Sequence, residues 1–395
     1  MCSSDLVDDL EHYYWNLIHA HSTIEFGPGF LETRKILDPE LGNIRNLIKN
    51  AIRNHPSLGV IEVTIDLSWY FAKTIPSIEL LMEIGEQTKN LGDASIEARR
   101  LEVLGENLYF RSRYVDSSEY LKGARDKFFE SKDVFGAARC SKRIGDILYL
   151  QSKYDEATTV LQEARANFIE VGSVLYAARC SRNLGEILRL QSRYEEATAV
   201  LKEARVQLTE IGDILGATRC SQDLGNVLRM QNQYDGATDV LQEARAKFIE
   251  IGHDLSAVQC SRSLGNILFM QNQYDKATTV LKEARVKFIE LGEVIGATQC
   301  LHALGQIRSY QGDYAEASII LGEAREQSIK IGDRLGAAEC LQALGDNNRF
   351  EGKYVEAKEL LTQARDEFLN IGDSRGVEQC ESSLSKVIKA SRRKK

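Results

Sequence analysis

Between residues 94 and 374 the apolar positions recur at spacings of three and four, the pattern of an amphipathic helix. In one segment Cys140, Ile144 and Leu148 form a single apolar stripe, which predicts a first helix. After a short polar turn a second stripe predicts a second helix, with the members Tyr154, Ala157, Leu161, Ala164 and Phe168. Gly172 follows that stripe, at the place where a helix needs a left-handed cap residue.

The same two-helix pattern returns every 40 residues. Three residue types mark the period: Tyr114, Tyr154, Tyr194, Tyr234, Tyr274, Tyr314 and Tyr354; Gly105, Gly145, Gly185, Gly225, Gly265, Gly305 and Gly345; and Ala124, Ala164, Ala204, Ala244, Ala284, Ala324 and Ala364. In other units the glycine equivalent to Gly172 is followed by an aspartate that can cap the next helix, as at Asp213, Asp333 and Asp373. No alternating strand pattern occurs, so the sequence predicts an all-α repeat array in which each unit packs against its neighbours.

The unit Leu184-Gly185…Leu188…Tyr194…Ala197…Leu201…Ala204 resembles the tetratricopeptide repeat consensus. That family usually repeats at about 34 residues, and the longer period here is similar to the 40-residue variety of rapsyn and Pins-type adaptors. The resemblance covers residues 94–390. It implies a right-handed α-solenoid of about seven helical hairpins, whose first helices line a concave surface, with a C-terminal capping helix and a helical N-terminal extension.

The period also divides the chain. We expect a helical, linker-like extension in residues 1–57, with a turn-rich loop around Gly27-Pro28-Gly29, and a divergent helical pair in 58–93. Seven 40-residue units should fill 94–374, the first of them degraded, with Arg100 in place of the cysteine and Lys132 in place of the glycine. A capping helix and a basic tail should occupy 375–395.

The extension followed by repeats resembles fungal signal-transduction NTPases of the NB-ARC and NACHT type (STAND proteins), in which tetratricopeptide repeats form the C-terminal sensor. The resemblance implies that this chain corresponds to the sensor half of such a switch. The chain departs from that family because no Gly-x-x-x-x-Gly-Lys-Ser/Thr phosphate loop occurs in it. An NTPase would therefore have to be a partner or an upstream module.

Composition narrows the functional classes. Among 395 residues the formal net charge is −8, which does not favour general nucleic-acid binding. No stretch of about eighteen apolar residues predicts a membrane span. The first residues lack the basic and apolar regions of a secretory signal, and eight cysteines fit a reducing compartment. We therefore expect a cytoplasmic location and no membrane partner.

No motif predicts catalysis or a cofactor. Cys140 and its six equivalents at the 40-residue period could form a metal or redox ladder, but equivalent helices lie about 10 Å apart and no Cys-x-x-Cys pair occurs, which favours core packing. The six histidines lack a metal-ligand spacing, apart from the loose pair His12 and His19. Acidic pairs such as Glu195-Glu196 suit the start of a helix. We expect no enzyme activity, metal or cofactor.

The polar side of the first helices carries the candidate binding surface, here called the first-helix stripe. Basic residues outnumber the acidic Asp146, Glu186 and Asp223 on it, although the protein is acidic overall. Arginine can hold a carboxylate with two hydrogen bonds, and asparagine can both donate to and accept from a peptide backbone. The candidate residues are Arg139, Lys142, Arg143, Arg179, Arg182, Asn183, Arg189, Arg219, Asn226, Arg229, Arg262 and Asn266.

The stripe predicts a peptide or protein ligand with acidic side chains or a free carboxylate. The opposing interpretation is that these charges only solvate the helix surface. Lys142, Asn183 and Arg219 match the carboxylate clamp of chaperone-tail-binding tetratricopeptide domains, but Asp146 and Asp223 would repel a carboxylate. For the basic tail that ends at Lys395, a frayed helix end is favoured over a contact with nucleic acid, lipid or an import receptor.

Two functions follow from the sequence. The first is a non-catalytic interaction scaffold or adaptor that binds a peptide or protein segment in the concave groove. The alternative is the ligand-sensing regulatory half of an NB-ARC/NACHT-type NTPase switch whose nucleotide-binding module is not in this chain.

Overall fold

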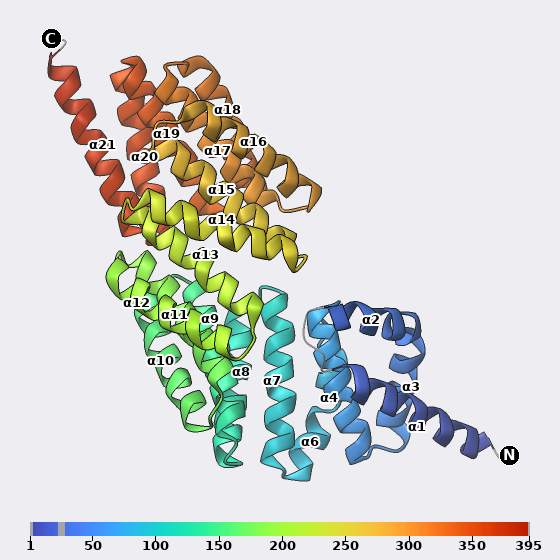
Figure 1. Ribbon diagram of the computed structural model, residues 1–395. Helices are drawn as coiled ribbons and strands as arrows, with labels where there is room; N and C mark the ends of the chain where they lie inside the picture. Colours follow the sequence, from blue (N-terminus) through green and yellow to red (C-terminus); the bar gives the residue numbers. More distant parts are fainter. Residues whose placement is uncertain (1–2, 23–27, 394–395) are drawn as a thin grey trace. The chain divides into compact units, whose positions relative to one another are not determined.

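The computed structural model describes residues 3–22 and 28–393, and every regular element in that part of the chain is a helix (Figure 1). The elements before the repeats are α1 (Ser3–His21), α2 (Pro28–Leu37), η1 (Asp38–Glu40), α3 (Leu41–Asn54), α4 (Leu58–Lys73), α5 (Glu79–Glu83) and α6 (Gly85–Leu91). The chain divides into two compact units, residues 1–187 and 188–395, and each is described by itself.

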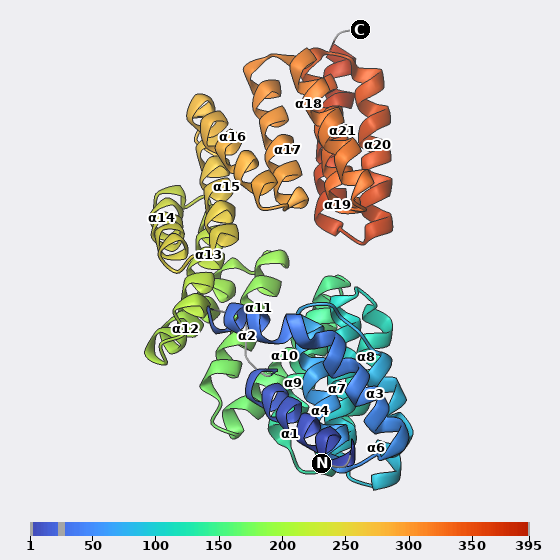
Figure 2. The ribbon, with the colours of Figure 1, turned by 90° about the vertical axis from the view of Figure 1, so that its right-hand side faces the viewer.

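From residue 94 onwards the helices alternate as first and second members of hairpins, which confirms the predicted two-helix unit. The first helices are α7 (Ala94–Phe110), α9 (Val134–Leu150), α11 (Val174–Leu190), α13 (Ile214–Met230), α15 (Asp254–Met270), α17 (Val294–Gln311), α19 (Arg334–Glu351) and the capping helix α21 (Ser374–Arg393). The second helices are α8 (Tyr114–Glu130), α10 (Tyr154–Glu170), α12 (Tyr194–Glu210), α14 (Tyr234–Glu250), α16 (Tyr274–Glu290), α18 (Tyr314–Lys330) and α20 (Tyr354–Ile371). Figure 2 shows these hairpins from a second side.

The turns use the residues that the sequence indicates. Gly172 follows α10 with φ +72°, a left-handed conformation in which a Cβ is unfavourable, so glycine suits this place. Asp213 begins the next repeat, and its Oδ1 accepts a hydrogen bond from the backbone N–H of Gly216 at 2.9 Å. Asp333 caps α19 in the same way through Gly336. The predicted left-handed and aspartate caps are confirmed.

Within each hairpin the period glycine sets how closely the two helices approach. A Cβ at Gly145 would lie 2.6 Å from Leu161 Cγ, and one at Gly225 would lie 2.5 Å from Leu241 Cγ. Because real side chains cannot come that close, glycine at this position lets the following helix place its leucine directly against the backbone. Leu161 and Leu241 are fully buried as a result.

The periodic cysteines belong to this core. Cys140 is buried among Ala98, Leu121 and Phe128, and its six equivalents are buried free thiols as well. Burial raises the pKa of the Cys180 thiol to about 12, so it stays protonated and unreactive at neutral pH. The prediction that these cysteines act as small core residues is confirmed; Cys2 lies outside the described residues.

The N-terminal segment differs from the sequence expectation in one respect. Gly27 lies outside the described residues, but Pro28 and Gly29 open helix α2 instead of forming part of a loop. Proline is well suited to the first turn of a helix, and α2 buries Phe30 and Leu37 in the core of this segment. The predicted turn-rich loop was therefore too long. The 58–93 segment forms α4 and the two short helices α5 and α6.

Arg100 shows how the first repeat tolerates a charge at the cysteine position. Its guanidinium donates to both oxygens of Glu97, at 2.8 and 2.7 Å, and to the carbonyl oxygen of Leu81 at 3.1 Å. Thr88 donates to Glu97 at 2.6 Å. The buried charge is thus paired and hydrogen-bonded, the condition for burying an ion at acceptable cost.

Candidate functional site

Neighbouring first helices are joined by polar contacts between residues 37 positions apart. A residue in the next repeat is 40 positions away, so a separation of 37 brings together side chains that differ by about one helical turn. Within unit 1 the pairs are Arg139–Glu102, Arg143–Glu106 and Asn183–Asp146. Within unit 2 they are Gln222–Gln259, Ser263–Asn226 and Ser383–Asp346. The first-helix stripe is therefore a connected polar surface within each unit.

In unit 1 the basic stripe residues are largely neutralised by carboxylates. Arg139 contacts Glu102 at 2.8 Å, and Arg143 holds Glu106 through two bonds of 2.6 and 2.9 Å. Lys142 is paired with Asp146 on its own helix at 2.9 Å. Burial alone would lower the pKa of Arg143, but Glu106 and Asp146 outweigh burial and raise it.

Glu102 and Glu106 are stripe residues that the sequence analysis missed. Both lie on α7, in the degraded first repeat, which the stripe was not extended to include. Their separation of 37 residues from Arg139 and Arg143 is a signal that could have identified them, once the one-turn offset is known. Burial, together with the charge of Glu106, raises the pKa of Glu102 to about 7 against the opposing effect of Arg139.

The middle of the stripe is held by aromatic and polar contacts. The Arg179 guanidinium lies 5.4 Å from the centre of the Tyr176 ring. In unit 2, Arg219 lies 3.2 Å from His253 Nε2, and the pKa of His253 is lowered by burial and by Arg219. Asn226 accepts a hydrogen bond from Ser263 at 2.9 Å. The stripe also includes Arg182 and Arg189, from α11.

Unit 2 contains the basic residues of the stripe that are not paired. Among the residues that the structure describes, neither Arg229 nor Arg262 has an ion pair or side-chain hydrogen bond, and Arg229 Nε is buried without a partner. Burial, with the nearby charges of Arg189, Arg262 and Arg375, lowers the pKa of Arg229 to about 10. Three guanidinium groups thus lie close enough to Arg229 to disfavour its charge, and an anion placed beside Arg229 would be stabilised.

Arg375, on α21, is the member of this group that the sequence analysis missed. It stands in the first turn of α21, which the sequence analysis predicted only as a capping helix. Arg229 on α13 and Arg375 on α21 are far apart in the sequence, and no sequence pattern indicated that their charges interact. Asn266, which the sequence analysis proposed, lies on α15 one turn beyond Arg262 and has no side-chain hydrogen bond in residues 28–393.

Two titratable groups share this part of the stripe. Glu339 stands three repeats after Arg219 and directly before Cys340. Burial raises its pKa to about 7, and Asp333 and Asp373 add to the effect. Arg375 and Arg262 oppose that rise. His302 is the next-repeat equivalent of Arg262; burial lowers its pKa to about 4, so it is neutral at pH 7.

No group of three or more histidine, cysteine or acidic side chains in residues 3–22 and 28–393 is placed to hold a metal ion. Across the same ranges, no helix combines the length and the apolarity needed to cross a bilayer. The arrangement of the stripe offers charge and hydrogen bonds to a ligand.

The sequence profile of the tetratricopeptide repeat matches residues 136–205, 297–366 and, in a second version, 223–289, which together make up just over half of the chain. The chain belongs to the tetratricopeptide repeat family. The resemblance stated from the sequence is confirmed. No curated protein matches this tetratricopeptide repeat chain in sequence.

Solved structures share the fold. The apo quorum sensor NprR from B. thuringiensis is 11% identical and has a TM-score of 0.64, over 93% of this chain and 100% of that chain. The Rap conjugation gene regulator of the plasmid pLS20, in complex with the Phr* peptide, is 14% identical with a TM-score of 0.61, over 92% and 98%. A STAND protein with a tetratricopeptide repeat sensor from Pyrococcus horikoshii is 14% identical with a TM-score of 0.57, over 95% and 55%.

Proposed function

We propose that this tetratricopeptide repeat protein is a non-catalytic scaffold or adaptor that binds a peptide or protein segment along its first-helix stripe. The observation that carries the proposal is the group of arginines in unit 2, where the half-buried Arg229 has a buried Nε without a hydrogen-bond partner and lies near Arg262 and Arg375. Burying unpaired cations costs free energy, and a ligand that supplies a carboxylate recovers it.

We infer that the ligand carries acidic side chains or a free carboxylate. Arginine binds carboxylate with two charge-assisted hydrogen bonds, and Asn266 adds a donor and an acceptor for the backbone of an extended segment. In unit 1 the stripe cations Arg139 and Arg143 are already paired with Glu102 and Glu106. Specific binding is therefore concentrated at Arg229 and Arg262, and the remaining stripe residues add polar contacts.

The fold neighbours support a peptide ligand. One of them is a regulator in complex with a peptide, and another is a quorum sensor. The same fold therefore accommodates a peptide in at least one protein. No cofactor or metal has a role in this proposal. Seven buried free thiols fit the reducing cytoplasm expected from the sequence.

The proposal is tested by display of a random peptide library on the wild-type chain and on an Arg229→Gln, Arg262→Gln double variant. We expect the wild type to enrich peptides with acidic residues or an acidic C-terminus, and the double variant to bind those peptides at least tenfold more weakly. Glutamine removes the charge without adding a carboxylate. A Lys202→Gln, Lys282→Gln variant loses the same charge from exposed positions on α12 and α16 and serves as the control.

Equal binding of the enriched peptides by the wild type and the Arg229, Arg262 variant would overturn the proposal, provided that both proteins give the same circular dichroism spectrum. Enrichment of basic or uncharged peptides would also overturn it. If the arginine double variant and the lysine double variant both bound the peptides more weakly than the wild type, and by the same factor, the net charge of the protein and not the arginine group would attract the peptides.

The alternative function is a regulatory half of an NB-ARC/NACHT-type NTPase switch. The likeness to the sensor-bearing STAND protein, of which this chain covers 55%, favours this alternative. The two functions differ in one measurement. A regulatory half changes the ATP hydrolysis rate of a STAND-type NTPase when mixed or fused with it, and a free adaptor leaves that rate unchanged.

A further inference from the structure

A groove on the second-helix side of unit 2 is separate from the first-helix stripe. It has a volume of about 1360 Å³, with α15 as its floor and α14 and α16 as its walls. The floor consists of Ala257, Val258, Ser261, Leu264 and Leu268, which share one face of α15 and extend over about 16 Å at 1.5 Å per residue. Arg262 and Asn266 of the stripe lie on a different face of the same helix.

Equivalent second helices elsewhere in unit 2 are braced across this gap. Arg285 of α16 lies 3.6 Å from Glu323 of α18, and Arg325 of α18 lies 3.8 Å from Glu367 of α20. The equivalents of Arg285 and Glu323 on α14 and α16 are Arg245 and Glu283, and the equivalent of Glu367 is Lys287, which has the opposite charge. Arg245 and Glu283 both line the groove, and no ion pair joins them in the described part of the chain.

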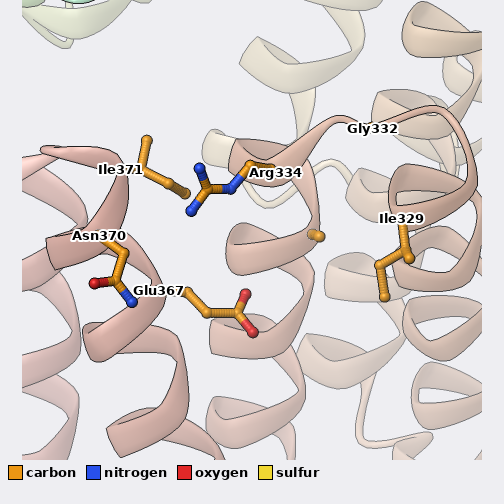
Figure 3. A pocket seen from close by; sticks show the side chains of 7 residues that line it. Ile329, Gly332, Arg334, Glu367, Asn370 and Ile371 are labelled. Atoms are coloured by element: carbon orange, nitrogen blue, oxygen red, sulfur yellow. The ribbon is translucent and has the colours of Figure 1, made fainter.

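The braced gap between α18 and α20 is much smaller. At one end of it lies a pocket of about 300 Å³ lined by residues that include Ile329, Arg334, Glu367 and Ile371 (Figure 3). These residues are the 80-residue equivalents of Ile249, Asp254, Lys287 and Leu291, which line one end of the larger groove. The groove between α14 and α16 is therefore a larger version of the pocket between α18 and α20 further along the chain.

One residue of the floor accounts for part of the difference. Position 261 carries a serine, as do the equivalent positions 141, 181 and 221 of the preceding repeats, whereas the two following repeats carry Leu301 and Leu341, which are 6% and 2% exposed. Leu301 packs against Ala324 of α18, and Leu341 packs in one cluster with Ala364 and Phe368 of α20. Ser261 is shorter and partly exposed, and the apolar Leu264 and Leu268 next to it are also only partly covered.

The charges around the groove indicate the kind of partner. Its rim carries Asp235, Asp239, Asp254 and Glu283 against two cations, Arg245 and Lys287. Lys287 is itself paired with Glu290 at 2.7 Å. The walls are helices whose backbone groups are already hydrogen-bonded, so they cannot add an extended strand, whereas a helix satisfies its own backbone and presents one apolar stripe.

We propose that the groove between α14 and α16 is a docking site for an amphipathic helix of a partner protein, with an apolar stripe against Leu264 and Leu268 and basic residues beside Asp235 and Asp239. Such a helix fills the space that is occupied in the later repeats by a leucine, such as Leu301, and by an ion pair between second helices. This docking site goes beyond the proposed peptide binding, because it uses another face of α15 and ligands of the opposite charge.

The test uses two synthetic 18-residue helices that share a Leu/Ala stripe, one flanked by lysines and the other by glutamates. Fluorescence anisotropy on the full chain in 0.1 M salt should give a Kd at least tenfold lower for the lysine-flanked helix. Ser261→Leu should weaken its binding at least tenfold, because the new side chain occupies the groove as Leu301 does in the next repeat. Asp235→Lys should weaken it as well and strengthen binding of the glutamate-flanked helix.

Asp275→Lys is the matched control, since Asp275 is the exposed equivalent of Asp235 on the next second helix and does not line the groove. It should leave both affinities unchanged. Equal binding of the two helices, no binding of either, or an equal effect of Asp235→Lys and Asp275→Lys would overturn the proposal. A wild-type dimer that becomes a monomer in Ser261→Leu would also overturn it, because a second copy would then be the occupant. The Arg229→Gln, Arg262→Gln variant should bind the lysine-flanked helix normally, which separates this proposal from the preceding one.

Discussion

Arg143 and Glu106 form a bidentate ion pair between α9 and α7, with Nε–Oε1 and Nη2–Oε2 distances of 2.6 and 2.9 Å. The guanidinium also lies 4.4 Å from the centre of the Tyr109 ring. The two charges are 37 residues apart, one period less one helical turn. This pair therefore has two effects. It fixes the register of adjacent hairpins, and it neutralises the charge of Arg143, which would otherwise attract a ligand.

Arg143→Met should lower the free energy of unfolding by about 2–3 kcal/mol, because it leaves the 8% exposed Glu106 carboxylate without its partner. The value is at the low end for a buried pair since Arg143 is 25% exposed. The double variant Arg143→Met, Glu106→Gln should recover part of the loss, because no unpaired charge then remains. Urea unfolding followed by circular dichroism measures both.

Arg193→Met is the matched control for this pair. It removes a bidentate pair of similar length with Glu196, but both side chains are about half exposed. Surface pairs contribute little to stability, so the unfolding midpoint should stay unchanged. If Arg143→Met and Arg193→Met had the same effect, the first-helix ion pairs would not hold the register of the hairpins.

The helix boundaries could be predicted from the sequence because each is fixed by local chemistry repeated many times. Tyr154 begins α10, and Gly172 has the left-handed conformation after it. Pairing across the stripe could not be predicted in the same way. Whether Arg143 is free or bound to Glu106 depends on the one-turn offset between neighbouring repeats, which no single repeat encodes.

The pairing state of the basic stripe residues and the groove on α15 were also beyond the sequence. Arg229 and Arg143 were proposed on the same grounds, as basic residues of the stripe. Only Arg143 has a carboxylate within reach, that of Glu106. The groove depends on whether three helices close over Ser261, a result of packing between repeats. The helix at Pro28 was missed because two glycines beside a proline are typical of a turn.

Gly265→Ala should destabilise the protein by about 1–3 kcal/mol, because the new methyl group would lie 2.7 Å from Leu281 Cγ and force the hairpin apart. Gly322→Ala is the matched control. It lies within α18 with no atom inside 4 Å of the added Cβ, so it should stabilise by about 0.5–1 kcal/mol through helix propensity alone. Thermal unfolding of the two variants should therefore shift in opposite directions.

Lys132→Gly should stabilise the first hairpin by about 1 kcal/mol. Lys132 has φ +64° between α8 and α9, where the equivalent residue of later repeats is glycine, as at Gly172. Glycine removes the strain of the left-handed conformation, partly offset by its greater freedom in the unfolded chain. Asn272→Gly, at another left-handed position with φ +59°, should have a smaller effect because asparagine tolerates this conformation. A larger gain at Asn272 than at Lys132 would contradict this account.

The protein should lose stability as the pH rises from about 4.5 to about 7, and Glu339 should be one cause. Its folded-state pKa is about 7, raised from 4.5 chiefly by burial. Between these two values the folded state keeps a proton that the unfolded state has released, so raising the pH favours unfolding, by an amount on the order of 2 kcal/mol. Above about pH 7 both states are ionised and this contribution is constant.

Glu339→Gln should flatten the profile of unfolding free energy against pH between about pH 4.5 and pH 7, measured by urea titration at half-unit steps. Glu359→Gln, on an exposed position of α20, should keep the wild-type slope. An unchanged slope in Glu339→Gln would show that Arg262 and Arg375 keep this carboxylate ionised, and with it that part of the arginine group is already neutralised.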